Sequence, residues 1–364
     1  MRVWQFIKKE AVLSAASLAA IISMFFVPPS LSYIGYIDFR TLALLLALML
    51  TVAGAKKAGV FEILISSCFS VVNGRRGMIL LLVSFCFFSS MLITNDVALI
   101  TFVPPAIMVF GTQLQTLMIT VVLMTVAANL GSMLTPVGNP QNLFLFSYFD
   151  MSISEFFAIT TPITAISAFL LIVAVIMLEK GDIEIAINDS AIEIRKLLPW
   201  GILFAICLAC VGRMIDYRLM LVIVMAAVFF IDRSLLREAD YNLLITFVAF
   251  FIFVGNMQSL PAVKELLSKL VLGREFASGV LLSQVISNVP AAVMLSGFCE
   301  DSAALLAGVN IGGLGTPIAS MASLISYKQF AAVKAANTGR YMLLFLGVNT
   351  IMLISLVMAY LLAH

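Results

Sequence analysis

The amino-acid sequence predicts an all-α polytopic membrane protein. Of its 364 residues, 62% are hydrophobic and only 11% are charged, whereas a soluble domain carries about 25% charged residues. The apolar runs are long and unbroken, unlike the short alternating segments of a membrane β-barrel. A third observation is an internal repeat, in which the second half of the chain reproduces the order of segments found in the first.

Crossing helices are predicted wherever an apolar run, with its flanking residues, reaches the about 20 residues that span a bilayer. These segments are 11–27, 40–54, 116–149, 157–178, 199–212, 218–231, 242–258, 302–327 and 339–363. The first follows a basic N-terminus, and no small-residue cleavage site precedes Pro28 and Pro29. We therefore interpret it as a membrane helix and not as a removed signal peptide.

Two further apolar runs, 77–110 and 276–299, predict re-entrant hairpins. Residues 78–93 and 97–110 would form helices of about 24 Å and 21 Å, which are shorter than the about 30 Å hydrocarbon core. The turn between them holds Asp96, so this carboxyl would lie near the bilayer midplane. A charge at that depth costs at least a few kcal/mol, which protonation or a bound cation would relieve.

The remaining segments are amphipathic or polar. Residues 59–72 and 260–273 precede the two hairpins and predict helices that lie along the membrane surface. The polar stretch 179–198 predicts a cytoplasmic linker between the two halves. The distribution of Lys and Arg favours a cytoplasmic N-terminus, hairpins that enter and leave on one side, and an external C-terminus.

The repeat is visible when residues 129–146 are aligned with 310–327 without a gap. With hairpin tips entering from opposite sides, the two halves form an inverted repeat, the usual construction of secondary transporters. The paired residues are Asn129 with Asn310, Gly131 with Gly312, Thr135 with Thr316, Pro136 with Pro317, and Asn95 with Asn288.

The candidate site lies where the hairpin tips meet the two broken helices. Unwound segments expose carbonyls to a cation and helix N-termini to an anion. The predicted ion-coupling residues are Asp96, Asn95, Asn129, Thr135 and Gly138, with Asp96 and Asn95 as ligands of an Na⁺ ion. The predicted substrate-binding residues are Thr94, Asn95, Thr135, Pro136, Asn139, Asn142, Ser287, Asn288, Asn310, Thr316, Pro317 and Ser320.

Structural explanations compete with these roles. Asn and Ser side chains often only join membrane helices, and Asp96 could be a hydrogen-bonded structural carboxyl. The spacing of Gly308 and Gly312 favours close helix packing over a binding site. Other acids fall at predicted helix ends, where water would solvate them: Asp216, Asp232, Asp240, Glu300 and Asp301.

The motifs resemble those of the ion transporter superfamily, which includes divalent-anion symporters, citrate transporters, arsenite permeases and sodium/proton antiporters. The resemblance rests on residues 94–96, on "TPVGNPQN" at 135–142, on 287–290 and on "GTP" at 315–317. The symporters carry Ser-Asn-Thr at both tips, whereas this chain has Thr-Asn-Asp and Ser-Asn-Val. The antiporters place a second acid where this chain has Asn139, which weakens an antiporter interpretation.

This resemblance implies an elevator mechanism and a homodimer. The scaffold would comprise 1–72 and 199–273, and the moving transport domain would comprise 77–178 and 275–364. It further implies an integral protein of a prokaryotic inner membrane that moves a small anion, such as a carboxylate or oxyanion, with Na⁺ or H⁺. A cation/proton antiporter or an arsenite-type efflux permease is the alternative.

Other function classes fit the sequence less well. A channel needs a continuous polar pore, which opposed half-helices would block. An intramembrane aspartyl protease needs two acids at depth, and the only histidine is His364, so we expect no enzyme. No cofactor other than the Na⁺ ion and no nucleic-acid partner is expected. Na⁺ or H⁺ coupling and uptake or efflux remain alternatives at this stage.

Overall fold

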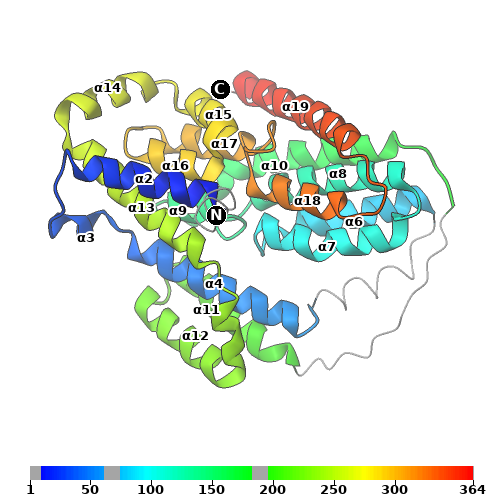
Figure 1. The fold of residues 1–364 in the computed structure, drawn as a ribbon, viewed down its shortest axis with the longest axis horizontal. Helices are drawn as coiled ribbons and strands as arrows, with labels where there is room; N and C mark the ends of the chain where they lie inside the picture. The colour runs from blue at the N-terminus through cyan, green and yellow to red at the C-terminus, as the bar shows by residue number, and fades with distance from the viewer. Residues whose placement is uncertain (1–9, 61–73, 183–195, 364) are drawn as a thin grey trace, which may run out of the picture.

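The computed structural model describes residues 10–60, 74–182 and 196–363, and within these ranges the chain is helical and contains no strand (Figure 1). The helices of the first half are α2 (Ala11–Met24), α3 (Ser32–Tyr36), α4 (Phe39–Lys57), α6 (Arg75–Ser89), α7 (Asn95–Phe110), α8 (Leu114–Ser132), α9 (Pro140–Tyr148) and α10 (Ile153–Ile176). Those of the second half are α11 (Leu198–Val211), α12 (Tyr217–Asp232), η2 (Arg233–Arg237), α13 (Tyr241–Ser259), α14 (Pro261–Val271), α15 (Glu275–Ile286), α16 (Asn288–Ser296), α17 (Ser302–Ile311), α18 (Met321–Ala331) and α19 (Thr338–Ala363).

The polytopic membrane architecture is confirmed. Among the described residues, 6 helices are long and apolar enough to cross a membrane unaided, and α2 and α11 supply shorter apolar helices. The two predicted segments 116–149 and 302–327 are each broken in the middle, so that α8 is followed by α9 and α17 by α18. The short helix α3 was not predicted; it follows Pro28 and Pro29, which end the preceding segment.

Both predicted hairpins are present as pairs of short helices. Helices α6 and α7 pack against each other, and so do α15 and α16. Residues 276–299 do not form one continuous helix, because Ser287 takes a left-handed conformation, with φ of 79°, between α15 and α16. Helix α15 has 12 residues and α16 has 9, which gives lengths of about 18 Å and 14 Å, too short to cross the hydrocarbon core.

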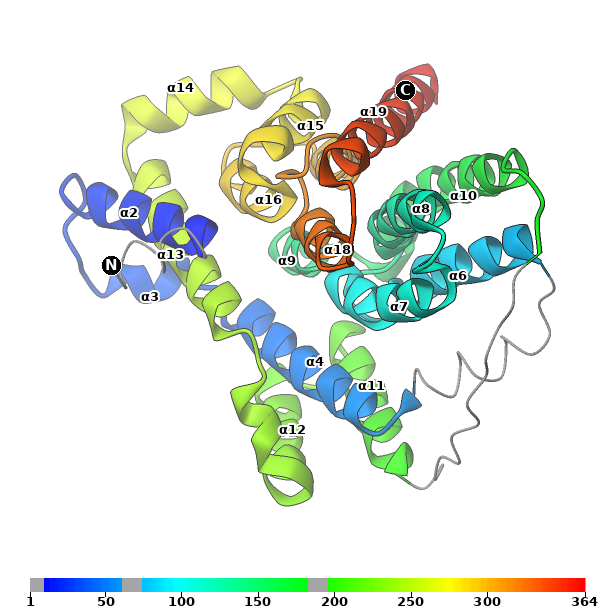
Figure 2. The same ribbon diagram turned by 45° about the vertical axis from the view of Figure 1, so that its right-hand side comes forward.

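Two hydrophobic cores organise the molecule. One joins α6, α7, α8, α10, α18 and α19 with one face each of α15 and α17. The other joins α2, α4, α11, α12 and α13 with α9 and α16. Figure 2 shows α13 beside α2 and α4 beside α11, within the second group of helices.

The half-helices α9 and α16, which belong to the repeats, thus pack on the side of α4 and α13. Phe144 of α9 stacks near Phe247 and Phe251 of α13, at centroid distances of 6.2 and 5.6 Å.

Helix α14 corresponds to the second predicted amphipathic segment. Its charged side chains Lys264, Glu265 and Lys269 are exposed, and Lys269 pairs with Glu265 at 2.6 Å. In Figures 1 and 2 it connects α13 to α15 along the outer edge of the molecule. Most of the first amphipathic segment (61–73) and of the linker (183–195) lies outside the described residues.

Candidate functional site

Glycine residues allow each hairpin to pack closely against the broken helix of its own repeat. A Cβ atom at Gly131 would lie 2.0 Å from the Phe87 carbonyl oxygen, and one at Gly312 would lie 2.9 Å from the Ser283 side chain. Phe87 belongs to α6 and Ser283 to α15, so the two glycines perform the same task in the two repeats. Gly308 likewise faces the Phe276 backbone at 2.4 Å, which confirms the close-packing role predicted for this residue.

The break between α8 and α9 follows from its sequence. Gly138 folds back onto the end of α8, and a Cβ atom there would lie 2.1 Å from the Ser132 carbonyl oxygen. Asn139 then caps α9, because its side-chain oxygen accepts the Asn142 backbone N–H at 2.9 Å. Pro140 occupies the first turn of α9, where a missing N–H is not needed.

A buried hydrogen-bond network joins the first hairpin tip to both broken helices. Asn95 Nδ2 donates to Asn129 Oδ1 at 2.9 Å, and Ser320 Oγ donates to the same oxygen at 3.0 Å. Asn129 Nδ2 in turn donates to the Gly313 carbonyl at 3.4 Å. The second hairpin tip reaches the same place, since a Cβ atom on Gly313 would lie 2.9 Å from Asn288 Nδ2.

A second set of hydrogen bonds joins the start of α9 in the first repeat to Asn310 in the second repeat. Asn139 Nδ2 donates to Asn310 Oδ1 at 3.3 Å, and Asn310 Nδ2 donates to Asn142 Oδ1 at 2.6 Å. In the alignment of the repeats, Asn139 corresponds to Ser320 and Asn129 to Asn310. The residue at the N-cap position of each second half-helix, Asn139 or Ser320, therefore bonds to the aligned Asn of the other repeat.

The two Thr-Pro motifs fasten the broken helices to their own hairpins. Thr135 Oγ1 donates to the Met91 carbonyl of the first hairpin. Thr316 Oγ1 donates to the Gln284 carbonyl of the second hairpin at 2.9 Å. Met91 and Gln284 are equivalent positions when Asn95 is aligned with Asn288. The repeat predicted from sequence thus appears as equivalent contacts.

The loops of the two broken helices are held by different residues. In the first repeat, Asn142 Nδ2 donates to the carbonyls of Ser132, Met133 and Thr135 at 3.1 to 3.3 Å. In the second repeat the residue equivalent to Asn142 is Ser323, whose buried hydroxyl has no hydrogen-bond partner among the described residues.

In the second repeat, the loop between α17 and α18 is held by Gln284 of the second hairpin. Gln284 Nε2 donates to the carbonyls of Gly312 and Leu314 at 2.8 and 2.9 Å, and Gln284 Oε1 accepts the Thr316 N–H at 2.9 Å.

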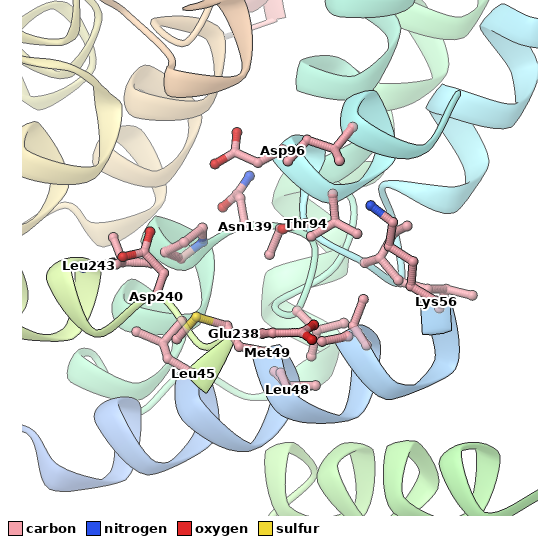
Figure 3. Close-up of a pocket in the computed structure, with 18 of the residues that line it drawn as sticks. Leu45, Leu48, Met49, Lys56, Thr94, Asp96, Asn139, Glu238, Asp240 and Leu243 are labelled. Carbon is pink, nitrogen blue, oxygen red and sulfur yellow. Dashed lines mark hydrogen bonds between the residues drawn. The ribbon is translucent and has the colours of Figure 1, made fainter. Parts of the chain in front are cut away.

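A cavity of about 700 Å³ lies between the first hairpin tip and α4. One wall comes from α7, α9 and α18, and the other from α4 and the start of α13. Figure 3 shows Thr94, Asp96 and Asn139 on the first wall, with Leu48, Met49 and Glu238 opposite. Most of the lining is apolar: Leu45, Leu48, Met49, Val52, Ala53, Leu92, Ile93, Val97, Ile100, Val137, Pro140, Leu143, Leu243, Met321 and Ile325.

Asp96 lines this cavity and is partly buried. Its backbone N–H donates to Asn95 Oδ1 at 3.0 Å, but among the described residues no hydrogen bond reaches its carboxylate oxygens. A structural carboxyl would have such partners. The Asp96 carboxylate therefore faces the cavity without a hydrogen-bond partner among the described residues.

The opposite wall carries charges that the sequence analysis did not assign to the site. They are Lys56, Lys57, Glu238 and Asp240. Lys57 is paired with Asp232 at 2.6 Å. Asp240 caps α13 by accepting the Leu243 N–H at 3.0 Å, which agrees with its predicted place at a helix end. Only the fold brings that end to the hairpin tip, so no sequence signal could have found it.

The predicted site residues fall into three groups. Thr94, Asp96 and Asn139 line the cavity. A larger group lies in the buried contacts between the hairpins and broken helices: Asn95, Asn129, Thr135, Asn142, Ser287, Asn288, Asn310, Thr316 and Ser320. The third group shapes the unwound loops by backbone conformation: Pro136, Gly138 and Pro317.

Helix N-termini at the cavity wall could attract an anion. Helices α7, α9 and α18 begin at the cavity wall, near Thr94, Pro140 and Met321. Unpaired N–H groups and the helix dipole make such ends favourable for an anion. The described part of the chain gathers no three His, Cys, Asp or Glu side chains as a metal site. A cation here would rely on Asp96 and neutral oxygens.

A family model and two related proteins each match most of the chain. A family model described as citrate transporter matches residues 3–308. An uncharacterized transporter of Methanocaldococcus jannaschii is 32% identical over 296 residues, which cover 80% of this chain and 80% of the relative. The inner membrane protein YbiR of Escherichia coli is 30% identical over 310 residues, which cover 84% of this chain and 83% of that protein.

Proposed function

The chain belongs to the citrate transporter family, and from this premise we propose that it is an ion-coupled secondary transporter of a small anion, such as a carboxylate or oxyanion. The family and the names of the relatives indicate a membrane transporter and not an enzyme. The proposal therefore concerns the substrate class, the coupling ion and the mechanism.

The observation that carries the proposal is the position of Asp96. Its carboxylate faces a cavity at the start of three helices and lacks a hydrogen-bond partner among the described residues. A bound Na⁺ or a proton would neutralise it and leave the helix N-termini to attract an anion. Binding of cation and anion at neighbouring positions would then be mutually favourable, which is the basis of coupled transport.

The buried asparagines support this role indirectly. The side chains of Asn95 and Asn129 form hydrogen bonds with each other, with Ser320 and with the Gly313 carbonyl. We propose that they hold the hairpin tip in place, so that Asp96 and Thr94 present their oxygens to the cavity. The Na⁺ ligands would then come mainly from this wall, with Asn95 acting through its contact with the Asp96 backbone.

The arrangement of the cavity suits an elevator mechanism. Asp96 and Asn139 belong to the repeats, whereas Lys56 and Asp240 belong to the predicted scaffold. If the Lys-rich end is cytoplasmic, as the positive-inside rule predicts, the cavity opens inward. A homodimer through the scaffold completes the proposal, and native mass spectrometry in detergent would test it.

Cation/proton antiport, or efflux of a metalloid oxyanion, is the second candidate. The single acid at the hairpin tip would favour it, because one carboxylate that alternates between Na⁺ and H⁺ is sufficient for exchange. Asn139, where antiporters would carry a second acid, makes it the weaker candidate.

The test is transport in proteoliposomes. Uptake of labelled citrate, succinate, sulfate and arsenite is measured under an Na⁺ gradient, a pH gradient and neither. Coupled anion uptake by the wild type, its loss in Asp96→Asn and its retention in Asp216→Asn would support the proposal. Asp216 caps α12 through the Arg218 N–H and does not line the cavity. Gradient-driven uptake by Asp96→Asn at the wild-type rate would refute the role of Asp96.

A further inference from the structure

The cavity contains a second carboxylate on the wall that faces Asp96. Asp240 lies at the start of α13, after the turn that carries Glu238, and it lines the same cavity as Asp96. Figure 3 shows the two carboxylates on opposite walls of the cavity, with Asp240 beside Leu243. One belongs to the repeats and the other to the predicted scaffold, so their separation would depend on how these two parts are positioned.

We propose that Asp240 is a positioning residue for ion coupling: its negative charge strengthens cation binding at Asp96 while the two walls face each other. This inference rests on the proposed function of Asp96. Two like charges across a partly desolvated cavity repel each other, and a cation or proton on Asp96 removes that repulsion. Asp240 therefore favours the loaded form of Asp96 in this arrangement, and the preference is lost when the walls move apart.

The other charges of the cavity do not replace Asp240 in this role. Lys57 forms its ion pair with Asp232 at 2.6 Å and is directed to that side. Glu238 and Asp240 are both exposed, but Glu238 acts on Lys57. Lys56 lines the cavity from α4, and in Figure 3 it lies on the far side of Thr94 from Asp240. Asp240 is thus the acid that acts on Asp96 from the facing wall.

The decisive variant is Asp240→Asn. Asparagine is as good a helix cap as aspartate, and its side-chain oxygen can still accept the Leu243 N–H, so α13 is preserved while the charge is removed. Na⁺ binding to purified protein is measured by calorimetry at low, constant ionic strength. Asp216→Asn is the matched control, because it makes the same change at the cap of another scaffold helix.

We expect Asp240→Asn to weaken Na⁺ binding about 2- to 5-fold, the range for a charge pair with one exposed partner. Asp216→Asn should leave Na⁺ affinity unchanged, because Asp216 does not line the cavity. The effect of Asp240→Asn should shrink at 1 M choline chloride, where the Debye length is about 3 Å. If protons drive transport, the proton concentration for half-maximal uptake replaces Na⁺ affinity as the measured quantity, with the same expected direction.

An unchanged cation affinity in Asp240→Asn at low ionic strength would overturn the inference. That result is distinguishable from failure of the proposed function. In the first case Asp96→Asn still abolishes cation dependence, whereas in the second Asp96→Asn transports like the wild type. An equal loss of affinity in Asp216→Asn would also overturn the inference, because it would show a general effect of scaffold charge.

Discussion

Ser320 of the second repeat donates a hydrogen bond of 3.0 Å to Asn129 of the first. Its counterpart, from Asn139 to Asn310, spans 3.3 Å in the other direction. Ser320 is the N-cap residue that precedes α18 but forms no side-chain cap, so its hydroxyl serves the contact between the repeats. These two bonds tie the two broken helices together at the centre of the molecule.

Replacing Ser320 tests the strength of this contact. Ser320→Ala should lower the free energy of unfolding by about 1 kcal/mol, the net value of a typical hydrogen bond. Ser320→Asn, which introduces the residue found at the equivalent position 139, should recover part of the loss. Thermal unfolding of purified protein measures both variants. Equal stability of Ser320→Ala and wild type would show that Asn95 alone satisfies the Asn129 oxygen.

Gln284 tests the asymmetry between the two unwound loops. Gln284→Met introduces the residue of the first hairpin and leaves the buried carbonyls of Gly312 and Leu314 without their donor. A buried unsatisfied group costs about 1–3 kcal/mol, so the unfolding temperature should fall clearly. Gln329→Met removes a single bond to the Leu99 carbonyl and should cost less.

The double variant Gln284→Met with Ser323→Asn provides the rescue. Residue 323 corresponds to Asn142, and an asparagine there could reach the loop carbonyls from α18 as Asn142 does from α9. We expect partial recovery of thermal stability. No recovery would mean that an asparagine at position 323 cannot hold the loop of the second repeat as Asn142 holds that of the first.

Gly131 tests the packing of the first hairpin. Gly131→Ala places a methyl group 2.0 Å from the Phe87 carbonyl oxygen, so α6 and α8 must move apart. Such overpacking typically costs about 1–3 kcal/mol. Gly347→Ala in α19 meets nothing within 4 Å and should be neutral or slightly stabilising. The comparison is by thermal unfolding, and equal behaviour of the two variants would contradict the close approach.

The elevator proposal predicts a distance change across the cavity. Spin labels at Met49 of α4 and Ile100 of α7 stand on opposite walls. Their distance distribution should shift when coupling ion and substrate are added. Labels at Met49 and Ile202 should keep their distance, because α4 and α11 pack together. Pulsed electron resonance measures both pairs, and an unchanged first pair under all conditions would contradict the elevator.

The pH dependence of Na⁺ binding has a definite sign. Proton and Na⁺ would compete for the same Asp96 carboxylate, and a metal ligand must be deprotonated to bind. Lowering the pH should therefore raise the apparent dissociation constant for Na⁺, by up to about tenfold per pH unit once the proton predominates. Calorimetric titration across pH 5–8 measures this. An Na⁺ affinity independent of pH would separate the Na⁺ site from Asp96.

The sequence by itself determined the membrane fold and the repeat. The length of an apolar run can be read directly from the sequence, so the crossing helices could be predicted without knowledge of their neighbours. The breaks at Gly138, Pro140 and Thr316, and the turns that precede Asn95 and Asn288, follow from local backbone preferences. These features depend on residues close together in the chain, and the structure confirms them. Asp96 itself lies in the first turn of α7 and not in the connecting turn where it was predicted, because α7 begins at Asn95.

Only the tertiary structure decided which polar groups share a cavity. Asn95 and Asp96 are adjacent in sequence, yet Asn95 is buried against Asn129 while the Asp96 carboxylate faces open space. Asp240 lies more than a hundred residues away and reaches the same cavity because α13 begins beside the first hairpin. Which side of a helix faces a cavity, and which distant charge faces it in turn, depends on the packing of helices from both repeats. That packing arises from many weak contacts between distant segments, and no local pattern encodes it.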